Sequence, residues 1–323
     1  THALIPAAVE TLPATPVPLP ELEDAADAFT AAAKSAGTRK AYRQSLATFW
    51  TWCASVGRSP FPASPDTVRL YVVHLASVGR KLATIDRALA AISKAHRVKG
   101  LDSPTRSGLV GEVLAGMRRQ LGTPQRQALA FEPAHVLRIV HGLPVTRRGL
   151  RDRALVTLGF CGGFRADDLA RLVVEHVTDD GKGLVVNVPR SKTDQAGDGR
   201  LVGIPYQSDP DGCPVRAVRA WIAAAGLTAG PLFRAVDRHG KVSPTAMHPN
   251  RIGKAVTRMA HDAGLGDGFG GHSMRAGFCT TAARNGRGER AIMAVTGHKS
   301  ADTLRRYIRR GTLWQDNAAA GLY

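Results

Sequence analysis

The 323-residue chain is expected to be mainly α-helical, with one small antiparallel β-sheet in its second half. Two observations predict this fold class. Apolar residues recur at helical spacing through residues 21–122 and again in most of the chain beyond residue 133. Residues 183–206 instead hold two runs of aliphatic and β-branched residues around a polar loop, which is typical of a β-hairpin. A chain of this length can form two domains with separate cores.

A compact helical bundle is predicted at residues 21–122, after a disordered lead at residues 1–20 that is rich in Pro, Ala and Val. Thr38 is expected to cap the second helix, and Pro65 takes the first position of the third, where proline is favoured. The helices are expected at 22–35, 38–57, from 64 onward, at 82–98 and at 107–121. Their predicted inward residues include Tyr42, Leu46, Phe49, Trp50, Val68, Tyr71, Val72, Leu75, Ile85, Leu89, Ile92 and His96.

A polar linker interrupted by Pro124 is predicted at residues 123–130, and a larger domain at 131–323. In this domain we expect a small sheet at residues 173–206, with two strands within 183–206, and short extended pieces at 231–233 and Val242. The expected helices lie at 133–142, 150–161, after Arg165, at 213–225, at 249–263 and within 271–310.

The charge balance indicates a polyanionic partner. The chain holds 44 Lys and Arg against 26 Asp and Glu, a net charge of +18 at pH 7. A run of about 18 apolar residues and a signal-peptide layout are both missing from the sequence, which disfavours a membrane protein. The four cysteines are widely separated and the histidines lack metal-ligand spacing, so we expect a cytoplasmic protein with neither disulfides nor a bound metal.

One stretch, residues 271–310, concentrates chemically capable side chains. His272 and Arg275 are three residues apart and share a face of a helix. Ser300 is a candidate N-cap for a further helix that carries Tyr307 among four arginines. Any one of these residues alone is more often an ordinary surface or core residue. A tyrosine among so many cations nevertheless suits an anionic substrate, and a phosphodiester is the target that its phenol would attack.

Two upstream segments supply matching cations. Arg165 stands at the start of a short helix, three residues before Asp168, and we expect the Asp168 carboxylate to orient the Arg165 guanidinium. Lys192 lies in the polar loop RSKTDQAGDG between the two predicted strands. The alternatives are a weak surface ion pair for the first and a solvated lysine for the second.

In this order, the residues Arg165, Lys192, His272, Arg275, His298 and Tyr307 resemble the full catalytic set of the tyrosine recombinase (phage integrase) family. The motif GHSMR, the YIR around Tyr307, the acid at Asp168 and QALAFE at 127–132 resemble the Cre-type branch. The resemblance extends from about residue 24 onward. Cre itself has a Trp at the position of His298, whereas most of the wider family has His.

The resemblance implies a fold and a mechanism. The helical domain and the catalytic domain would clamp DNA, and no metal or cofactor would be needed. Tyr307 would attack a DNA phosphodiester and form a 3′-phosphotyrosyl link. Arg165 and Arg275 would hold the non-bridging oxygens, with Lys192 as general acid. His272 would take the phenol proton and His298 would donate to a phosphate oxygen.

The resemblance also implies a DNA surface and an assembly, namely a homotetramer that joins two DNA sites with inverted repeats through a Holliday junction. The second and fourth helices would face the major groove, and the fifth would contact phosphates. The residues expected to contact DNA are Arg39, Lys40, Arg43, Arg80, Lys81, Thr84, Arg87, Arg118 and Arg119. The apolar tail at 311–323 is expected to dock on a neighbouring protomer or, alternatively, to fold back on its own domain.

Three other functions remain open from the sequence. A type IB topoisomerase or a telomere-resolving enzyme shares the same catalytic residues. A non-catalytic DNA-binding protein of the same fold is expected to lack part of the set, and here the set is complete.

Overall fold

The computed structural model describes residues 36–121, 128–189, 199–312 and 319. The chain divides into two compact units, Thr1–Gln125 and Arg126–Tyr323, which are called the helical unit and the catalytic unit below. The expected helix at 22–35, the Lys192 loop and most of the tail lie outside the described residues. Among the residues that the structure describes, no helix combines the length and the apolar character needed to cross a membrane.

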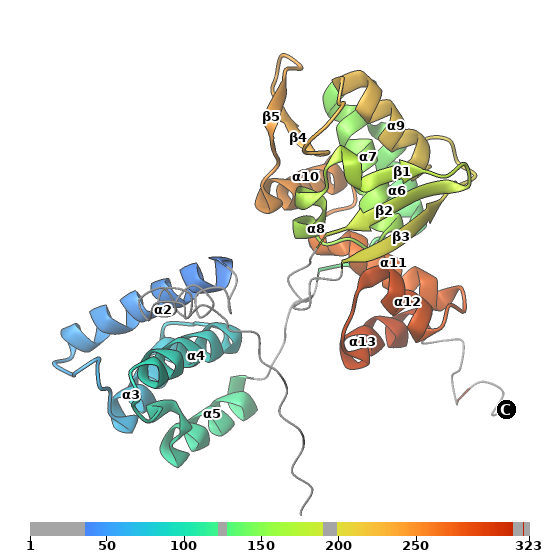
Figure 1. Cartoon of the computed structure of the whole chain (residues 1–323). Coiled ribbons are helices and arrows are strands. Elements are labelled where there is room, and N and C mark those ends of the chain that lie inside the picture. The colour runs from blue at the N-terminus through green and yellow to red at the C-terminus, as the bar shows by residue number, and fades with distance from the viewer. Residues whose placement is uncertain (1–35, 122–127, 190–198, 313–318, 320–323) are drawn as a thin grey trace, which may run out of the picture. The chain divides into compact units, whose positions relative to one another are not determined.

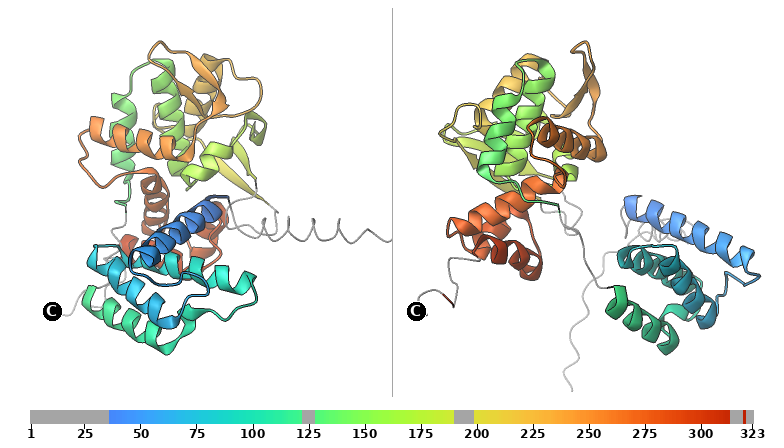
Figure 2. Two further views of the ribbon diagram at one scale, coloured as in Figure 1. Left: turned by 90° about the vertical axis from the view of Figure 1, so that its left-hand side faces the viewer. Right: turned by 180° about the vertical axis from the view of Figure 1, so that it is seen from behind.

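The helical unit consists of α2 (Ala36–Ser55), α3 (Pro65–Ser77), α4 (Leu82–Val98), the 3₁₀ turn η1 (Pro104–Arg106) and α5 (Gly108–Leu121). Helix α2 packs on α4, and α3 packs on α5, as can be followed in Figure 2. The predicted stripes of α3 and α4 are confirmed, since Val68, Val72, Ile85 and Ile92 are at most 1% exposed.

Specific hydrogen bonds fix the start of α3 and the last turn of α4. The Ser64 hydroxyl accepts from the Thr67 backbone N–H at 3.1 Å, and Pro65 follows it at the first helical position. The buried His96 ring accepts from the Ala63 N–H through Nε2 at 2.9 Å and contacts the Ile92 carbonyl through Nδ1 at 2.9 Å. This ring therefore fastens α4 to the segment before α3.

Two expectations for α2 were wrong. Thr38 lies inside the helix, which already includes Ala36, so it is not the N-cap. Trp50 is 54% exposed, whereas Trp52 packs against the core and lies 5.1 Å from Tyr71 between ring centroids. The buried seam follows Leu46, Phe49 and Cys53, and Trp50 lies on the far side of that seam.

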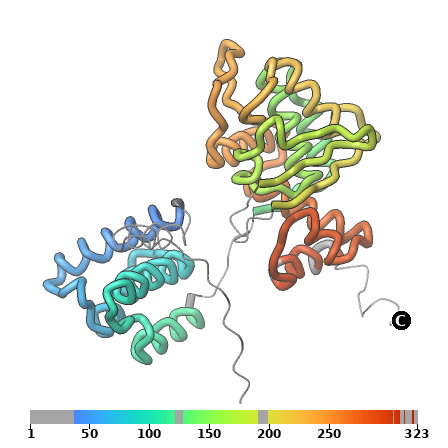
Figure 3. The backbone as a smooth tube through the Cα atoms, in the orientation of Figure 1, coloured from blue at the N-terminus to red at the C-terminus, as the bar shows by residue number. Residues whose placement is uncertain are grey.

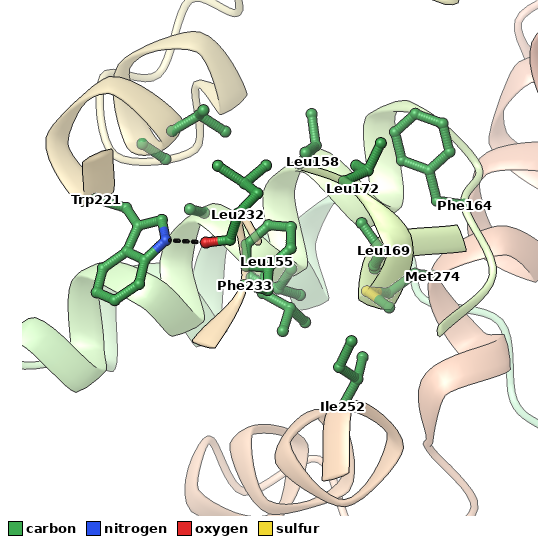
Figure 4. Close-up of a cluster of buried hydrophobic side chains, with 14 of the residues drawn as sticks. Leu155, Leu158, Phe164, Leu169, Leu172, Trp221, Leu232, Phe233, Ile252 and Met274 are labelled. Carbon is green, nitrogen blue, oxygen red and sulfur yellow. Dashed lines mark hydrogen bonds between the residues drawn. The ribbon is translucent and has the colours of Figure 1, made fainter. Parts of the chain in front are cut away.

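The catalytic unit is built around helix α7 (Arg147–Cys161), which is buried along most of its length. Around it lie α6 (Pro133–Gly142), α8 (Ala166–Arg171), α9 (Pro214–Ala225) and α10 (Pro249–Asp262). Their inner side chains form one apolar core, part of which is drawn in Figure 4. Its largest member is Trp221, whose indole Nε1–H donates to the Leu232 carbonyl at 2.8 Å, so the buried ring leaves no polar atom unpaired.

A three-stranded antiparallel sheet of order β1-β2-β3 covers this core. Its strands are β1 (Val177–Asp179), β2 (Gly183–Val188) and β3 (Arg200–Pro205). Leu184 pairs with Ile204 and Val186 with Val202, and all four are buried. The predicted hairpin is thus confirmed, while β1 is an additional strand that we did not predict. A second hairpin is formed by β4 (Arg234–Val236) and β5 (Val242–Ala246).

Three helices complete the unit: α11 (Gly271–Arg284), α12 (Glu289–Thr296) and α13 (Ala301–Gly311). Helix α13 packs on α11, and both contact α12. The backbone trace in Figure 3 places α12 and α13 at one end of the unit and the β4–β5 hairpin at the other. Figure 1 shows α11 running from the core towards α13, which brings the residues of the chemically rich stretch together.

The first described residues of the catalytic unit are hydrogen-bonded to residues at and just before the start of α11. The Leu129 N–H donates to the Gly268 carbonyl at 3.0 Å, and the Phe131 N–H donates to the Ser273 carbonyl at 3.1 Å. Leu129, near the end of the predicted linker, is therefore attached to the segment before α11, and Phe131, in the predicted domain, to α11 itself.

Candidate active site

Tyr307 meets His272 across the contact between α13 and α11. The distance between Tyr307 Oη and His272 Nε2 is 3.0 Å. The Tyr307 ring is half-buried against the small cluster of Cys279, Ala283 and Leu304, which fixes its position on α13. Burial raises the pKa of the Tyr307 phenol. The phenol is therefore protonated at neutral pH and needs a base before it can act as a nucleophile.

His272 has the properties of that base. Its side chain reaches the surface, yet the protein packed around the ring lowers its pKa, and the charges of Arg275 and Arg165 lower it further. A neutral imidazole can accept the phenol proton through the nitrogen that already contacts it.

Arg275 lies on α11, three residues after His272, and is fully buried, with an exposed fraction of 0%. Its Nη1 donates to the Gly163 carbonyl at 2.8 Å and to the Thr296 carbonyl at 2.6 Å. Burial lowers its pKa to about 10, with a further contribution from Arg165, so the guanidinium is still charged at neutral pH. Its Nε and Nη2 atoms are buried without a hydrogen-bond partner among the described residues. An anion at this place would satisfy them.

Arg165 reaches the site from the N-cap position of α8. Our expectation that the Asp168 carboxylate binds the Arg165 guanidinium was wrong. Asp168 Oδ2 instead accepts from the backbone N–H of Arg165 at 3.2 Å, as a residue three positions into a helix commonly does. The Arg165 Nη1 atom is buried and lacks a partner in the described part of the chain. Asp168 thus fixes the backbone from which Arg165 projects.

Arg200 is a residue of the site that sequence reasoning missed. It begins β3, directly after the Lys192 loop, and lies 3.5 Å from Asp168 Oδ2 through Nη2. Its Nε donates to the Val295 carbonyl at 3.0 Å, near the end of α12. Arg200 therefore connects the sheet, α8 and α12. No motif within the sequence indicated this role, because its partners are distant in the chain.

His298 lies two residues after the end of α12, and its ring contacts the last residue of that helix. Its Nδ1 is 2.8 Å from the Thr296 hydroxyl, and its ring centroid is 6.4 Å from that of Tyr307. Burial lowers the pKa of His298 to about 3, and the nearby charges of Arg275, Arg165, His272 and Arg200 act in the same direction. His298 is therefore neutral at neutral pH in the DNA-free protein.

Two glycines in the left-handed region shape this site. Gly163 has φ +56°, and an added Cβ would lie 2.8 Å from Phe278 Cδ1 and 2.9 Å from the Thr296 methyl carbon. Gly297 has φ +66° and turns the chain out of α12 towards His298. A side chain at Gly163 would push Thr296 and Phe278 away from the carbonyl that Arg275 binds.

An open depression lies beside Arg165 and His272. It is lined by Arg165, Ala166, Asp167, Pro249, Asn250, Gly253, Lys254, Thr257, Gly271 and His272. Lys254, on α10, adds a cation that our sequence analysis did not single out. The depression extends from Arg165 and His272 along α10, and Arg165 and Lys254 bring positive charge to its edge beside the acidic Asp167.

Five of the six predicted catalytic residues therefore gather in one place, and Lys192 lies outside the described residues. The predicted DNA-contacting cations of the helical unit are exposed on its surface, and Arg118 forms an ion pair with Asp86 at 3.2 Å. Thr84 is half-buried in the first turn of α4.

Known proteins are similar to this chain over most of its length. The model of the phage integrase family matches residues 130–312. An integrase/recombinase xerD homolog from Selenomonas ruminantium is 34% identical over 296 residues, which is 90% of this chain and 86% of that protein. The recombinase cre of Escherichia phage P1 is 27% identical over 280 residues, covering 80% of this chain and 79% of that protein.

Solved structures show the same fold. A XerH site-specific recombinase bound to difH substrate, in a pre-cleavage complex, matches with a TM-score of 0.57 at 15% identity. The match covers 83% of this chain and 74% of that one.

Proposed function

The chain belongs to the phage integrase family, and we propose that it is a tyrosine recombinase that cuts and rejoins DNA at specific sites with Tyr307 as its nucleophile. The observation that carries this proposal is the 3.0 Å contact between Tyr307 Oη and His272 Nε2, beside two arginines with unpartnered buried nitrogens among the described residues. A nucleophile, a base and an anion site thus occupy one place.

Cleavage is a transesterification. Tyr307 Oη bonds to the phosphorus while its proton passes to His272, and the bond from phosphorus to the 5′-oxygen breaks. The products are a 3′-phosphotyrosyl link and a strand with a free 5′-hydroxyl, once Lys192 has supplied a proton to the leaving oxygen. The number of phosphoester bonds is unchanged, so the 5′-hydroxyl of a partner strand can reverse the step and complete an exchange.

The arginines act on the transition state. Extra negative charge develops on the non-bridging oxygens, and the unpartnered nitrogens of Arg275 and Arg165 can donate to them. One preorganised donor of this kind contributes about 3 kcal/mol. Asp168 supports the step through the Arg165 backbone, and His298 contacts a phosphate oxygen.

The helical unit supplies a second grip on DNA in this proposal. The exposed cations at the starts of α2 and α4 and at the end of α5 are suited to phosphates and guanine edges. We infer a clamp of both units on an inverted-repeat site, with four protomers joining two such sites through a Holliday junction. The tail at 311–323 is our candidate for the link between protomers.

A substrate with sulfur at the bridging 5′ position of the scissile phosphate tests the chemistry. Its leaving group departs as a thiolate, which needs little protonation, and it rejoins poorly, so the covalent protein–DNA adduct accumulates. On ordinary DNA, Lys192→Ala should lower cleavage about 10²–10⁴-fold, the usual range for general acid catalysis. The sulfur substrate should restore adduct formation by this variant, as measured by denaturing gel electrophoresis.

Two control variants sharpen the test. Arg165→Ala should stay impaired with sulfur, because the arginine acts on oxygens that the substitution leaves alone. Tyr307→Phe should form no adduct on either substrate. An adduct with Tyr307→Phe would refute Tyr307 as the nucleophile. Rescue of Arg165→Ala but not of Lys192→Ala would assign the general acid to another residue.

A separate assay distinguishes the three enzyme classes. When two duplexes are incubated with the protein, a recombinase yields recombinant DNA, a topoisomerase relaxed DNA and a telomere resolvase hairpin ends.

A further inference from the structure

Thr296 contacts two residues of the active site at once. It is the last residue of α12 and is fully buried. Its carbonyl accepts from Arg275 Nη1 at 2.6 Å, and its hydroxyl lies 2.8 Å from His298 Nδ1. The same hydroxyl donates to the Ile292 carbonyl at 2.7 Å, one helical turn earlier.

The direction of these hydrogen bonds follows from counting protons. A threonine hydroxyl has one hydrogen and two lone pairs. The Ile292 carbonyl can only accept, so the hydroxyl hydrogen must point to it. The opposite choice would leave two acceptor oxygens facing each other at 2.7 Å. The Thr296 hydroxyl therefore accepts from His298, and the hydrogen of that contact belongs to His298 Nδ1.

We propose that Thr296 is a positioning residue that fixes His298 in the Nδ1–H form, so that the ring presents its Nε2 lone pair to the site. This assignment deepens the proposed function and rests on it only for the role of His298 at the phosphate. Because Nδ1–H stays on Thr296 in both charge states, Nε2 is the only ring atom that gains or loses a proton. A proton arriving at Nε2 changes it from acceptor to donor without any movement of the ring.

This arrangement connects DNA binding to proton uptake. Burial lowers the pKa of His298 most, and the charges of Arg275, Arg165, His272 and Arg200 lower it further. The Tyr307 ring faces His298 from α13. A bound phosphodiester brings a negative charge among these cations and favours the imidazolium. His298 then donates from Nε2 to a phosphate oxygen, whereas in the DNA-free protein it cannot donate from this atom.

Nuclear magnetic resonance of the full chain tests the assignment directly. Two-bond ¹H–¹⁵N correlation spectra of protein labelled with ¹⁵N-histidine separate protonated from bare ring nitrogens, and His298→Gln identifies the His298 signals. Without DNA near pH 7.5, the wild type should show a protonated Nδ1 and a bare Nε2. A protonated Nε2 with a bare Nδ1 would overturn the proposal, and this measurement needs no Thr296 variant.

Two substitutions at Thr296 give the matched comparison. Thr296→Ser keeps the hydroxyl and should keep the Nδ1–H pattern. Thr296→Val keeps the shape but removes the acceptor, so the Nε2–H form should appear. Cleavage by Thr296→Val should fall about 10–100-fold, as when partners that orient metal-ligating histidines are removed, while Thr296→Ser stays near wild type. An unchanged Nδ1–H pattern in Thr296→Val would contradict the role of the hydroxyl.

The two proposals fail in different ways. A protein that shows the Nδ1–H pattern but forms no phosphotyrosyl adduct would reject the recombinase mechanism and leave the tautomer assignment standing. An active enzyme with a protonated Nε2 would reject the Thr296 assignment alone.

Discussion

The titratable side chains that surround Tyr307 are mostly cationic. In the DNA-free protein, His272 and His298 are neutral, which limits the positive charge of the site. Arg275 is buried and still charged, while the pKa values of His272 and His298 are both lowered by burial and by the neighbouring arginines. An anion is the ligand that suits the unpartnered buried nitrogens of Arg165 and Arg275 among the described residues. The two histidines therefore stand ready to accept protons when a phosphate arrives.

Stability should depend on pH through these histidines. The pKa of His298 is about 3 in the fold and ordinarily 6.5, so between these values the unfolded chain binds more protons than the folded one. The stabilisation is fully present above about pH 6.5 and is lost progressively as the pH falls towards 3. The melting temperature of the DNA-free protein should therefore drop from pH 7 to pH 5, and that of His298→Gln should drop less.

A surface histidine provides the control for this measurement. The side chain of His261 is 78% exposed, so His261→Gln should keep the wild-type pH dependence. If His298→Gln and His261→Gln gave the same slope of melting temperature against pH, burial of His298 would not be the cause.

The sequence indicated which residues meet at the site but not how they contact one another. The resemblance to the tyrosine recombinase family, carried by the order of these residue types, implied the gathering of Arg165, His272, Arg275, His298 and Tyr307. The bond from Asp168 to the Arg165 backbone N–H is a local contact typical of a helix start, which we passed over in favour of the guanidinium. The roles of Arg200 and Thr296 could not be predicted, because each depends on chain segments that only tertiary packing brings together.

At the scale of elements, the turn between α7 and α8 supports Arg275. Gly163 provides the carbonyl for Arg275 Nη1 and packs against Phe278 and Thr296. The element boundaries of α4 and α6 were predicted to the residue, because apolar spacing and a proline mark them. Strand β1 was missed because it has three residues, too few for an alternating pattern to show.

Gly163→Ala should therefore damage both the fold and catalysis. The left-handed backbone costs about 1–2 kcal/mol for a residue with a side chain. The contacts with Phe278 and Thr296 add about 1–3 kcal/mol of overpacking. Urea unfolding should show the combined loss of stability, and the cleavage rate of the folded variant should fall.

Gly226→Ala separates the two contributions. Gly226 ends α9 with φ +61°, and an added Cβ there meets nothing within 4 Å. This variant should show the backbone cost alone, with cleavage unchanged. Equal effects of both substitutions on cleavage would mean that the packing around Gly163 does not support the site.

At the scale of the whole molecule, the excess of cations should govern DNA affinity. A net charge of +18 implies that many bound phosphates release counterions on binding. We expect a steep fall in affinity from about 50 to 200 mM salt, measured by fluorescence anisotropy. A flat dependence would contradict binding through the phosphate backbone.

Paired substitutions locate the cations responsible. Neutralising Arg39 and Arg43 on α2 should weaken binding and reduce the slope of log affinity against log salt by about 2, because each cation that pairs with a phosphate adds roughly one to that slope. Circular dichroism should show an intact fold. Neutralising Arg216 and Arg219, exposed on α9, removes the same formal charge and should change the slope less.

Composition and periodicity predict two domains joined by a linker at residues 123–130. Pro124 and the surrounding polar residues indicated a linker up to Ala130. The backbone of Leu129 is nevertheless hydrogen-bonded to Gly268. Because Gly268 is distant in the chain, this contact could not be predicted from a local sequence pattern.

The contact between Tyr307 and His272 joins two helices of one chain, and this has a consequence for control. In the proposed mechanism the nucleophile and its base therefore belong to the same protomer, and no nucleophile is borrowed from a neighbour. In an assembly of several copies, a protomer could be silenced by lifting α13 from α11, which would separate the phenol from its base. The timing of strand breakage would then depend on how stably α13 packs on α11.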